Sequence, residues 1–284
     1  MPYNLITILG PTAVGKTNLG VKLANKFNGE IISADSRQVY KGMNIGTGKD
    51  LNEYRINKTK IQYHLIDIIK PEDEFNLFEF IKHFNSAFTE IRDRNKTPIM
   101  VGGTGLYVSS ILQKYNLSKT DFNDGYIEQL KKMSTEKLVS ILKKLNSKLH
   151  NTTDLLDRER IIKAIAVEKS KLKNEKITSN VNSFNIGIFL SRDKIKEKIK
   201  LRLKHRLENG MIEEVECLMK SGITYNRLML FGLEYKFIAM YLKGELNYND
   251  MFQKLNSAIN SFAKRQMTWF RKMEREGCVI NWIE

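Results

Sequence analysis

Short apolar runs alternate with helical patterns along the first part of the chain. Residues 3–9 predict a buried strand because the run is short, apolar and β-branched, and residues 30–34 and 97–101 predict two more. Residues 16–27 and 76–92 instead repeat apolar side chains at helical spacing. Strands that alternate with helices indicate an α/β fold, a parallel sheet wrapped by helices that binds ligands at the carboxyl ends of its strands.

The pattern changes after Ile111. Between Lys131 and Lys176 there are thirteen Lys and Arg against six Asp and Glu, and apolar residues recur at helical spacing. We therefore expect residues 118–180 to form a small basic helical insertion domain. Residues 1–117 and 181–284 are expected to form the core.

The end of the core is predicted to be helical. Residues 185–190 resemble a returning strand, and residues 192–275 follow a helical pattern. Four glycines punctuate this region as expected helix ends: Gly210, Gly222, Gly232 and Gly244.

A phosphate-binding motif follows the first predicted strand. The segment Gly10-Pro11-Thr12-Ala13-Val14-Gly15-Lys16-Thr17 matches the pattern G-x-x-x-x-G-K-[ST] in full. Glycines let backbone N–H groups turn toward an anion, Lys16 neutralises phosphate charge, and the Thr17 hydroxyl can ligate Mg²⁺. A chance match without a ligand is the alternative. With strand and helix both in place, the motif predicts a P-loop NTPase-like core with a diphosphate or triphosphate site.

A polar cluster follows the second predicted strand: Asp35-Ser36-Arg37-Gln38. In a parallel sheet, this position lies close to the phosphate loop. Asp35 could cap a helix, bind Mg²⁺ through water or act as a general base. Arg37 can contact a phosphate and Gln38 an adenine edge.

Two glycine-rich stretches accompany this cluster. Residues 42–48 contain three glycines, and Gly102, Gly103 and Gly105 follow the strand predicted at 97–101. Such glycines either form plain turns or let a ligand or another backbone approach closely.

Three further side chains have two interpretations each. Arg265 and Arg271 alternate with aromatic residues, which suits phosphate contacts with base stacking, whereas a stripe of Phe262, Trp269 and Met273 suits a helix core. His64 is expected to be buried and hydrogen-bonded rather than catalytic.

The overall charge favours polyanionic partners. There are 47 Lys and Arg against 32 Asp and Glu, a formal net charge of +15, although a charged solubility surface would look the same. Cys217 and Cys278 are too few for a disulfide framework, which favours a reduced compartment. No apolar run reaches the length of a membrane span. We therefore expect a soluble, cytoplasmic protein with no membrane partner.

Together these segments resemble the tRNA dimethylallyltransferase (tRNA isopentenyltransferase) family. The resemblance rests on the phosphate loop and on four further segments: EIISADSRQVYKGMNIGTGK at 30–49, YHLIDI at 63–68, PIMVGGTGLY at 98–107 and AKRQMTWFRK at 263–272. It spans nearly the whole chain, and the family's basic helical insertion has its counterpart around residues 118–180.

The resemblance implies a specific reaction. The phosphate loop, Gly10 to Thr17, would hold the diphosphate of dimethylallyl diphosphate, and the adenine 3′ of the tRNA anticodon would be flipped into a channel. The adenine N6 would attack the allylic carbon while Asp35 accepts the amine proton. Lys16, Thr17 and Mg²⁺ would stabilise the leaving diphosphate.

It also implies the residues that contact tRNA. They are Asp35, Ser36, Arg37, Gln38, Thr104, Glu159, Arg160 and Lys163, and we add Arg265. Glu159 and Arg160 belong to a D-x-x-R pattern that starts at Asp157. The protein is expected to act as a monomer on the anticodon stem-loop.

The chain departs from the family pattern in the late helical region. Members usually have an isoleucine-glycine-tyrosine-lysine type segment where this chain has Phe231-Gly232-Leu233-Glu234-Tyr235-Lys236. The family's arginine near the diphosphate could correspond to Lys198 or Arg202, and we choose Arg202 as a catalytic residue. The chain ends soon after Trp282, so we expect no longer tail.

Three other functions share part of this pattern. A small-metabolite or nucleoside kinase would use the same phosphate loop but has no need of a basic helical domain. An adenylate isopentenyltransferase would use the same donor with a free nucleotide. A nucleotide-dependent RNA-binding switch would bind without turnover, and Asp35 would then have no chemical role.

Overall fold

The computed structural model describes residues 2–56, 59–115, 117–118, 125–145, 158–170, 176–177 and 179–284. The chain divides into two units. The larger comprises Met1–Lys114 and Ser179–Glu284, and the smaller comprises Tyr115–Thr178.

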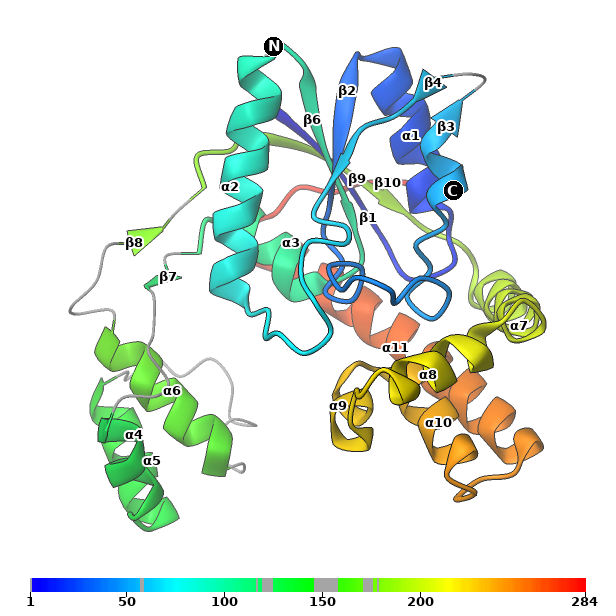
Figure 1. Cartoon of the computed structure of the whole chain (residues 1–284). Helices are drawn as coiled ribbons and strands as arrows, with labels where there is room; N and C mark the ends of the chain where they lie inside the picture. Colours follow the sequence, from blue (N-terminus) through cyan, green and yellow to red (C-terminus); the bar gives the residue numbers. More distant parts are fainter. Residues whose placement is uncertain are drawn as a thin grey trace. The chain divides into compact units, whose positions relative to one another are not determined.

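A parallel sheet of six strands forms the centre of the larger unit (Figure 1). In sheet order its strands are β10 (Asn281–Ile283), β9 (Ser183–Ile188), β1 (Leu5–Leu9), β6 (Thr97–Gly102), β2 (Gly29–Ser33) and β5 (Tyr63–His64). The register places Ile8 of β1 opposite Val101 of β6 on one side and Ile186 of β9 on the other. Because all the strands run the same way, the loops after β1, β2 and β6 emerge at one edge, where such sheets bind ligands.

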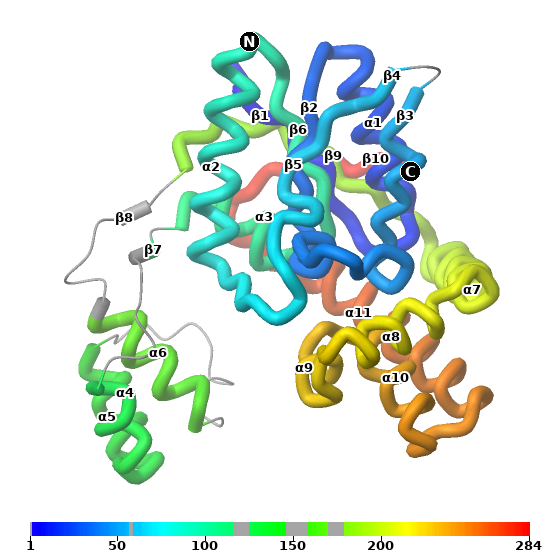
Figure 2. Tube along the Cα trace, in the orientation of Figure 1, coloured from blue at the N-terminus to red at the C-terminus, as the bar shows by residue number. Residues whose placement is uncertain are grey.

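Helices cover both faces of this sheet (Figures 1 and 2). On one face α1 (Lys16–Lys26) buries Val21 and Ala24 against Ile31 and Ile99. Because side chains alternate along a strand, the next residue of β2, Ile32, points to the other face. There α2 (Leu77–Asp93) packs on β2 and β6, and α3 (Gly105–Leu112) packs beside α2. The predicted α/β fold is therefore confirmed.

The predicted elements agree with the structure to within about two residues, as is usual for element boundaries. The strand predicted at 185–190 begins earlier, at Ser183, and ends at Ile188. Two sheet strands were not predicted, β5 and β10, because strands of two or three residues are too short to show a period. The structure also contains the short helix η1 (Leu51–Tyr54) and an antiparallel pair of β3 (Arg55–Ile56) and β4 (Thr59–Lys60).

Helices follow β9, as predicted. They are α7 (Arg192–Glu208), α8 (Met211–Lys220), α9 (Tyr225–Leu230), α10 (Leu233–Leu242) and α11 (Tyr248–Arg275). The four predicted helix-end glycines all separate these helices, with positive φ angles that suit glycine: Gly210, Gly222, Gly232 and Gly244. The helices share one core with Val39, Tyr40 and Met43, so the chain just after β2 is packed into the late helical region.

The smaller unit contains α4 (Gly125–Lys131), α5 (Thr135–Leu145) and α6 (Arg158–Ser170). A short antiparallel pair, β7 (Leu117–Ser118) and β8 (Lys176–Ile177), lies where the chain enters and leaves it. Leu130, Leu142, Ile161 and Ile165 are buried together among these helices. This unit thus has a small apolar core of its own.

His64 belongs to an ionic cluster around a buried carboxylate. Glu30 of β2 is 2% exposed and accepts hydrogen bonds from His64 Nε2 and Arg94 Nη2, each at 2.7 Å, while Lys96 Nζ lies 2.9 Å away. The expected hydrogen bond of His64 is confirmed, and its side chain is mostly but not fully buried, at 17% exposed. These contacts stabilise the sheet.

Candidate active site

The phosphate loop has the backbone of an anion cradle. Between β1 and α1 the chain turns through positive φ angles at Gly10 (149°), Ala13 (67°) and Gly15 (89°). A Cβ on Gly10 would lie 2.7 Å from the carbonyl oxygen of Ile188, so only glycine fits there. Helix α1 then begins at Lys16, and its first N–H groups and positive dipole end face the loop.

Cations lie close together beside this cradle. Lys16 Nζ donates to the Pro11 carbonyl at 2.5 Å, and Arg202 Nη2 of α7 donates to the Thr12 hydroxyl. Burial and the neighbouring guanidinium of Arg202 lower the pKa of Lys16 to about 7. Burial and Arg206 lower the pKa of Arg202 to about 10, so Arg202 remains charged at neutral pH. A bound anion would relieve this crowding of positive charge.

The loop after β2 presents Asp35. Asp35 Oδ1 accepts a hydrogen bond from the backbone N–H of Arg37 at 2.8 Å, a turn-stabilising bond made by one carboxylate oxygen. The Ser36 N–H donates to the Thr104 hydroxyl at 3.1 Å, which joins this loop to the loop after β6. Gln38 accepts from the Ser33 hydroxyl at 2.9 Å and donates to the Gly48 carbonyl at 3.2 Å. The loop is therefore held by one hydrogen bond of its own and by bonds to Ser33, Gly48 and Thr104.

The glycines after β6 permit close approaches. A Cβ on Gly102 would lie 2.3 Å from the Ala34 carbonyl oxygen, and one on Gly105 would lie 2.5 Å from the Trp269 ring. Of the two interpretations for this stretch, close packing is thus confirmed. The backbone of the three loops is brought together at the carboxyl edge of the sheet.

These loops and the late helices enclose a cavity of about 780 Å³, which we call the site cavity. Most of the predicted site residues of the larger unit line it: Thr12, Ala13, Gly15, Lys16, Thr17, Asp35, Ser36, Arg37, Gln38, Thr104, Arg202 and Arg265. Lys198 and Arg202 were alternatives in the sequence. Both line the cavity, and Arg202 is the one hydrogen-bonded to the phosphate loop.

The remaining predicted residues lie elsewhere. Gly10, Pro11 and Val14 belong to the phosphate loop but do not line the site cavity, and Val14 packs into the core beneath α1. Glu159, Arg160 and Lys163 are exposed on α6 of the smaller unit. Asp157, the start of the predicted D-x-x-R pattern, lies outside the described residues.

The stripe on α11 is not a simple core stripe. Met273 is buried, but Phe262 is 38% exposed, and Phe262 and Trp269 line the site cavity together with Ile259 and Phe231. The expectation of a core position is therefore wrong for Phe262, because the cavity lies over that side of the helix. These side chains add an apolar part to the lining of the cavity.

Several residues of the site were not predicted from the sequence. Gln266 of α11 is 6% exposed, accepts from the Thr12 N–H at 2.8 Å and donates to the Gly103 carbonyl at 2.7 Å. The segment that contains Gln266 pointed to this helix, but not to this side chain. Glu234 and Tyr235 also line the cavity, and burial raises the pKa of both.

A model of the family described as IPP transferase matches residues 38–273 of the chain. A protein of Geotalea uraniireducens named "tRNA dimethylallyltransferase 1" is 53% identical over the whole of this chain and 93% of its own length. The crystal structure of the full-length tRNA isopentenylpyrophosphate transferase from Bacillus halodurans has a TM-score of 0.70 and 32% identity, covering 99% of this chain and 89% of that one. The corresponding enzyme structure from Staphylococcus epidermidis has a TM-score of 0.67 and 30% identity, covering 98% and 92%.

Among the described residues, none of the helices is both long and apolar enough to cross a bilayer.

Proposed function

This chain belongs to the IPP transferase family, and we propose that it transfers the dimethylallyl group of dimethylallyl diphosphate to tRNA. The acceptor is N6 of the adenine on the 3′ side of the anticodon, and the product released is diphosphate. The proposal is supported by relatives of nearly the same length that are named for this activity.

The lining of the site cavity supports the proposed reaction. The site cavity is lined both by an anion cradle with Lys16 and Arg202 and by the polar loop with Asp35 and Gln38. The cradle and its cations can bind a diphosphate. Asp35 can take a proton from an amine, while Gln38 can recognise the edge of the base that carries the amine. The apolar part of the lining around Trp269 suits a hydrocarbon group.

The residues divide the reaction between them. The adenine N6 forms a bond to the allylic carbon while the bond from that carbon to the diphosphate oxygen breaks. One carboxylate oxygen of Asp35 accepts a hydrogen bond from the Arg37 N–H. We propose that the Asp35 carboxylate acts as the general base that accepts the proton from N6. Lys16 and Arg202 stabilise the negative charge that develops on the leaving diphosphate.

A magnesium ion fits the oxygen groups of this cavity. The Thr17 hydroxyl and the Asp35 carboxylate both line it, and Mg²⁺ binds through few protein oxygens while keeping water and phosphate ligands. Thr17 would hold the ion directly and Asp35 through water. When bound, the ion would neutralise diphosphate charge and favour its departure.

We propose that tRNA is held by two sets of residues. In the site cavity they are Asp35, Ser36, Arg37, Gln38, Thr104 and Arg265. On the smaller unit they are Glu159, Arg160 and Lys163, exposed on α6. The net charge of +15 supports a polyanionic partner. The free cysteines, Cys217 and Cys278, support action in the reducing cytoplasm, and we propose that a monomer carries it out.

The test is incubation with dimethylallyl diphosphate, Mg²⁺ and unmodified tRNA, followed by mass spectrometry of the nucleosides. We expect a prenylated adenosine in tRNA. Free AMP as acceptor and ATP as donor serve as controls. Prenylation of AMP alone, or phosphoryl transfer from ATP, would contradict the proposed function.

A further inference from the structure

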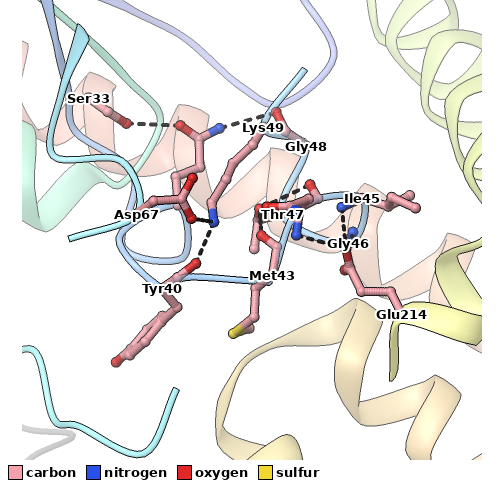
Figure 3. A network of polar contacts seen from close by, with 12 residues as sticks. Ser33, Tyr40, Met43, Ile45, Gly46, Thr47, Gly48, Lys49, Asp67 and Glu214 are labelled. Atoms are coloured by element: carbon pink, nitrogen blue, oxygen red, sulfur yellow. Dashed lines mark hydrogen bonds and ion pairs between the residues drawn. The ribbon is translucent and has the colours of Figure 1, made fainter. Parts of the chain in front are cut away.

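A carboxylate of α8 holds the glycine-rich loop of residues 42–49 (Figure 3). Glu214 Oε2 accepts from the backbone N–H groups of Asn44 at 2.8 Å and Ile45 at 2.7 Å. Glu214 Oε1 accepts from the Gly46 N–H at 3.0 Å and from the Tyr235 hydroxyl at 2.7 Å. Three consecutive amides thus point at one charged group, an arrangement that binds anions strongly.

Tyr235 of α10 also holds the glycine-rich loop. Its side chain is buried and lines the site cavity, and a Cβ on Gly46 would lie 2.7 Å from its ring. The loop can therefore lie against the ring only because residue 46 is glycine. Glu214 and Tyr235 together set how close this loop comes to the late helices.

The other end of the loop contacts Gln38, which we propose to recognise the acceptor base. The Gly48 carbonyl accepts a hydrogen bond from Gln38 Nε2 at 3.2 Å, and Gly46 and Gly48 line the cavity themselves. Lys49, 4% exposed, anchors the loop end by donating to the Tyr40 carbonyl and to Asp67 Oδ1 at 2.5 Å (Figure 3). A shift of the loop would change where the Gln38 amide points.

We infer that Glu214 is a positioning residue for acceptor recognition, acting through residues 44–48 on Gln38 and not on the phosphate cradle. The inference rests on the proposed function, because it concerns which of the two proposed substrates depends on the position of the loop for its binding. The phosphate loop has its own supports, Arg202 and Gln266, and the described contacts of Glu214 include none of its residues.

The test is Glu214→Gln. The variant replaces one accepting oxygen by an NH₂ group, which in either orientation faces at least one backbone N–H donor that cannot turn away. We expect the KM for tRNA to rise at least about tenfold, as expected for a misplaced binding group. The KM for dimethylallyl diphosphate and the Kd of inorganic diphosphate should stay unchanged. Glu216→Gln is the matched control, since Glu216 lies on the same helix in an exposed pair with Lys220 and should leave all three values unchanged.

Tyr235→Phe provides a second variant should Glu214→Gln fail to fold. It removes one of the four hydrogen bonds to Glu214 and should raise the KM for tRNA by a smaller factor, again without changing diphosphate binding. An unchanged KM for tRNA, or an equal loss on the diphosphate side, overturns the inference while the wild-type enzyme still prenylates tRNA. Absence of transfer by the wild type would instead contradict the proposed function.

Discussion

The side chain of Gln266 accepts a hydrogen bond from the backbone N–H of Thr12 at 2.8 Å, although the two residues are 254 positions apart. Its amide group also donates to the Gly103 carbonyl at 2.7 Å. One buried side chain of α11 therefore joins the phosphate loop to the loop after β6. Gln266 fixes the cradle by pairing two backbone groups, the Gly103 carbonyl in a buried bond and the Thr12 N–H in a partly buried one.

Gln266→Leu should destabilise the protein and weaken anion binding. The substitution leaves the Thr12 N–H and the Gly103 carbonyl without this partner, and the loss at the buried carbonyl alone costs about 1 to 3 kcal/mol. Urea unfolding and calorimetric titration with inorganic diphosphate measure the two effects. Gln253→Leu, at an exposed position of the same helix, should change stability by less than about 0.5 kcal/mol. Equal effects of the two substitutions would show that Gln266 has no special role.

Asp35→Ala should abolish most turnover while tRNA binding persists. A general base contributes at least about 10²-fold, so single-turnover prenylation should slow by that factor. Asp35→Asn separates two roles of the residue, because its amide oxygen can still accept from the Arg37 N–H but the group cannot take up a proton. If Asp35→Asn retained wild-type turnover, the proposed role of Asp35 as base would be wrong.

Diphosphate binding should consume protons above neutral pH. The pKa of Lys16 is lowered to about 7 by burial and by Arg202, so the ammonium form is lost as the pH rises through 7. A bound anion favours that form and raises the pKa again, and binding must therefore take up a proton between pH 7 and the higher pKa of the complex. Affinity falls over this range. Calorimetry in two buffers of different ionisation enthalpy measures the uptake, and Lys16→Met, which should lack it, corrects for titration of the ligand.

Acid should weaken the fold through Glu30. Burial opposes ionisation, but hydrogen bonds from Arg94, His64 and Lys96 prevail and lower the pKa of Glu30 to about 2. Because this pKa is depressed in the folded state, the stabilisation is present above the unfolded value of 4.5 and is lost as the pH falls through about 2. Urea unfolding between pH 5 and pH 2 should show a smaller decline for Glu30→Gln than for the wild type. Glu90→Gln, at an exposed residue, should decline like the wild type.

Lys163→Ala should weaken tRNA binding and its salt dependence together. If Lys163 contacts a phosphate, its loss should reduce the slope of log K against log salt by about one. Filter binding of unmodified tRNA at several salt concentrations measures the slope. Lys131, which pairs with Glu128 at 2.6 Å on the same unit, provides the control in Lys131→Ala. Equal slopes for Lys163→Ala and the wild type would contradict the proposed contact.

Local patterns predicted much of the fold. The strands at 3–9 and 97–101 and the helix at 76–92 were correct because their apolar residues repeat along contiguous stretches. The strands β5 and β10 were not predicted, because their few residues become strands only by pairing with neighbouring strands. Such short segments show no hydrophobic alternation in the sequence. Phe262 was misplaced for a similar reason. A helical stripe gives the face of a helix but not whether a core or a cavity covers that face.

The sequence by itself determined the phosphate loop, because its function lies in consecutive residues whose backbone angles glycine permits and whose helix follows at once. It also located Asp35 and Gln38 at the end of a strand. Only the tertiary structure decided which distant side chains complete the site. Gln266 and Glu214, which the sequence did not indicate, reach loops between 163 and 254 residues away in the chain. Such contacts depend on how helices pack on the sheet edge, and that packing is a property of the whole core rather than of any local pattern.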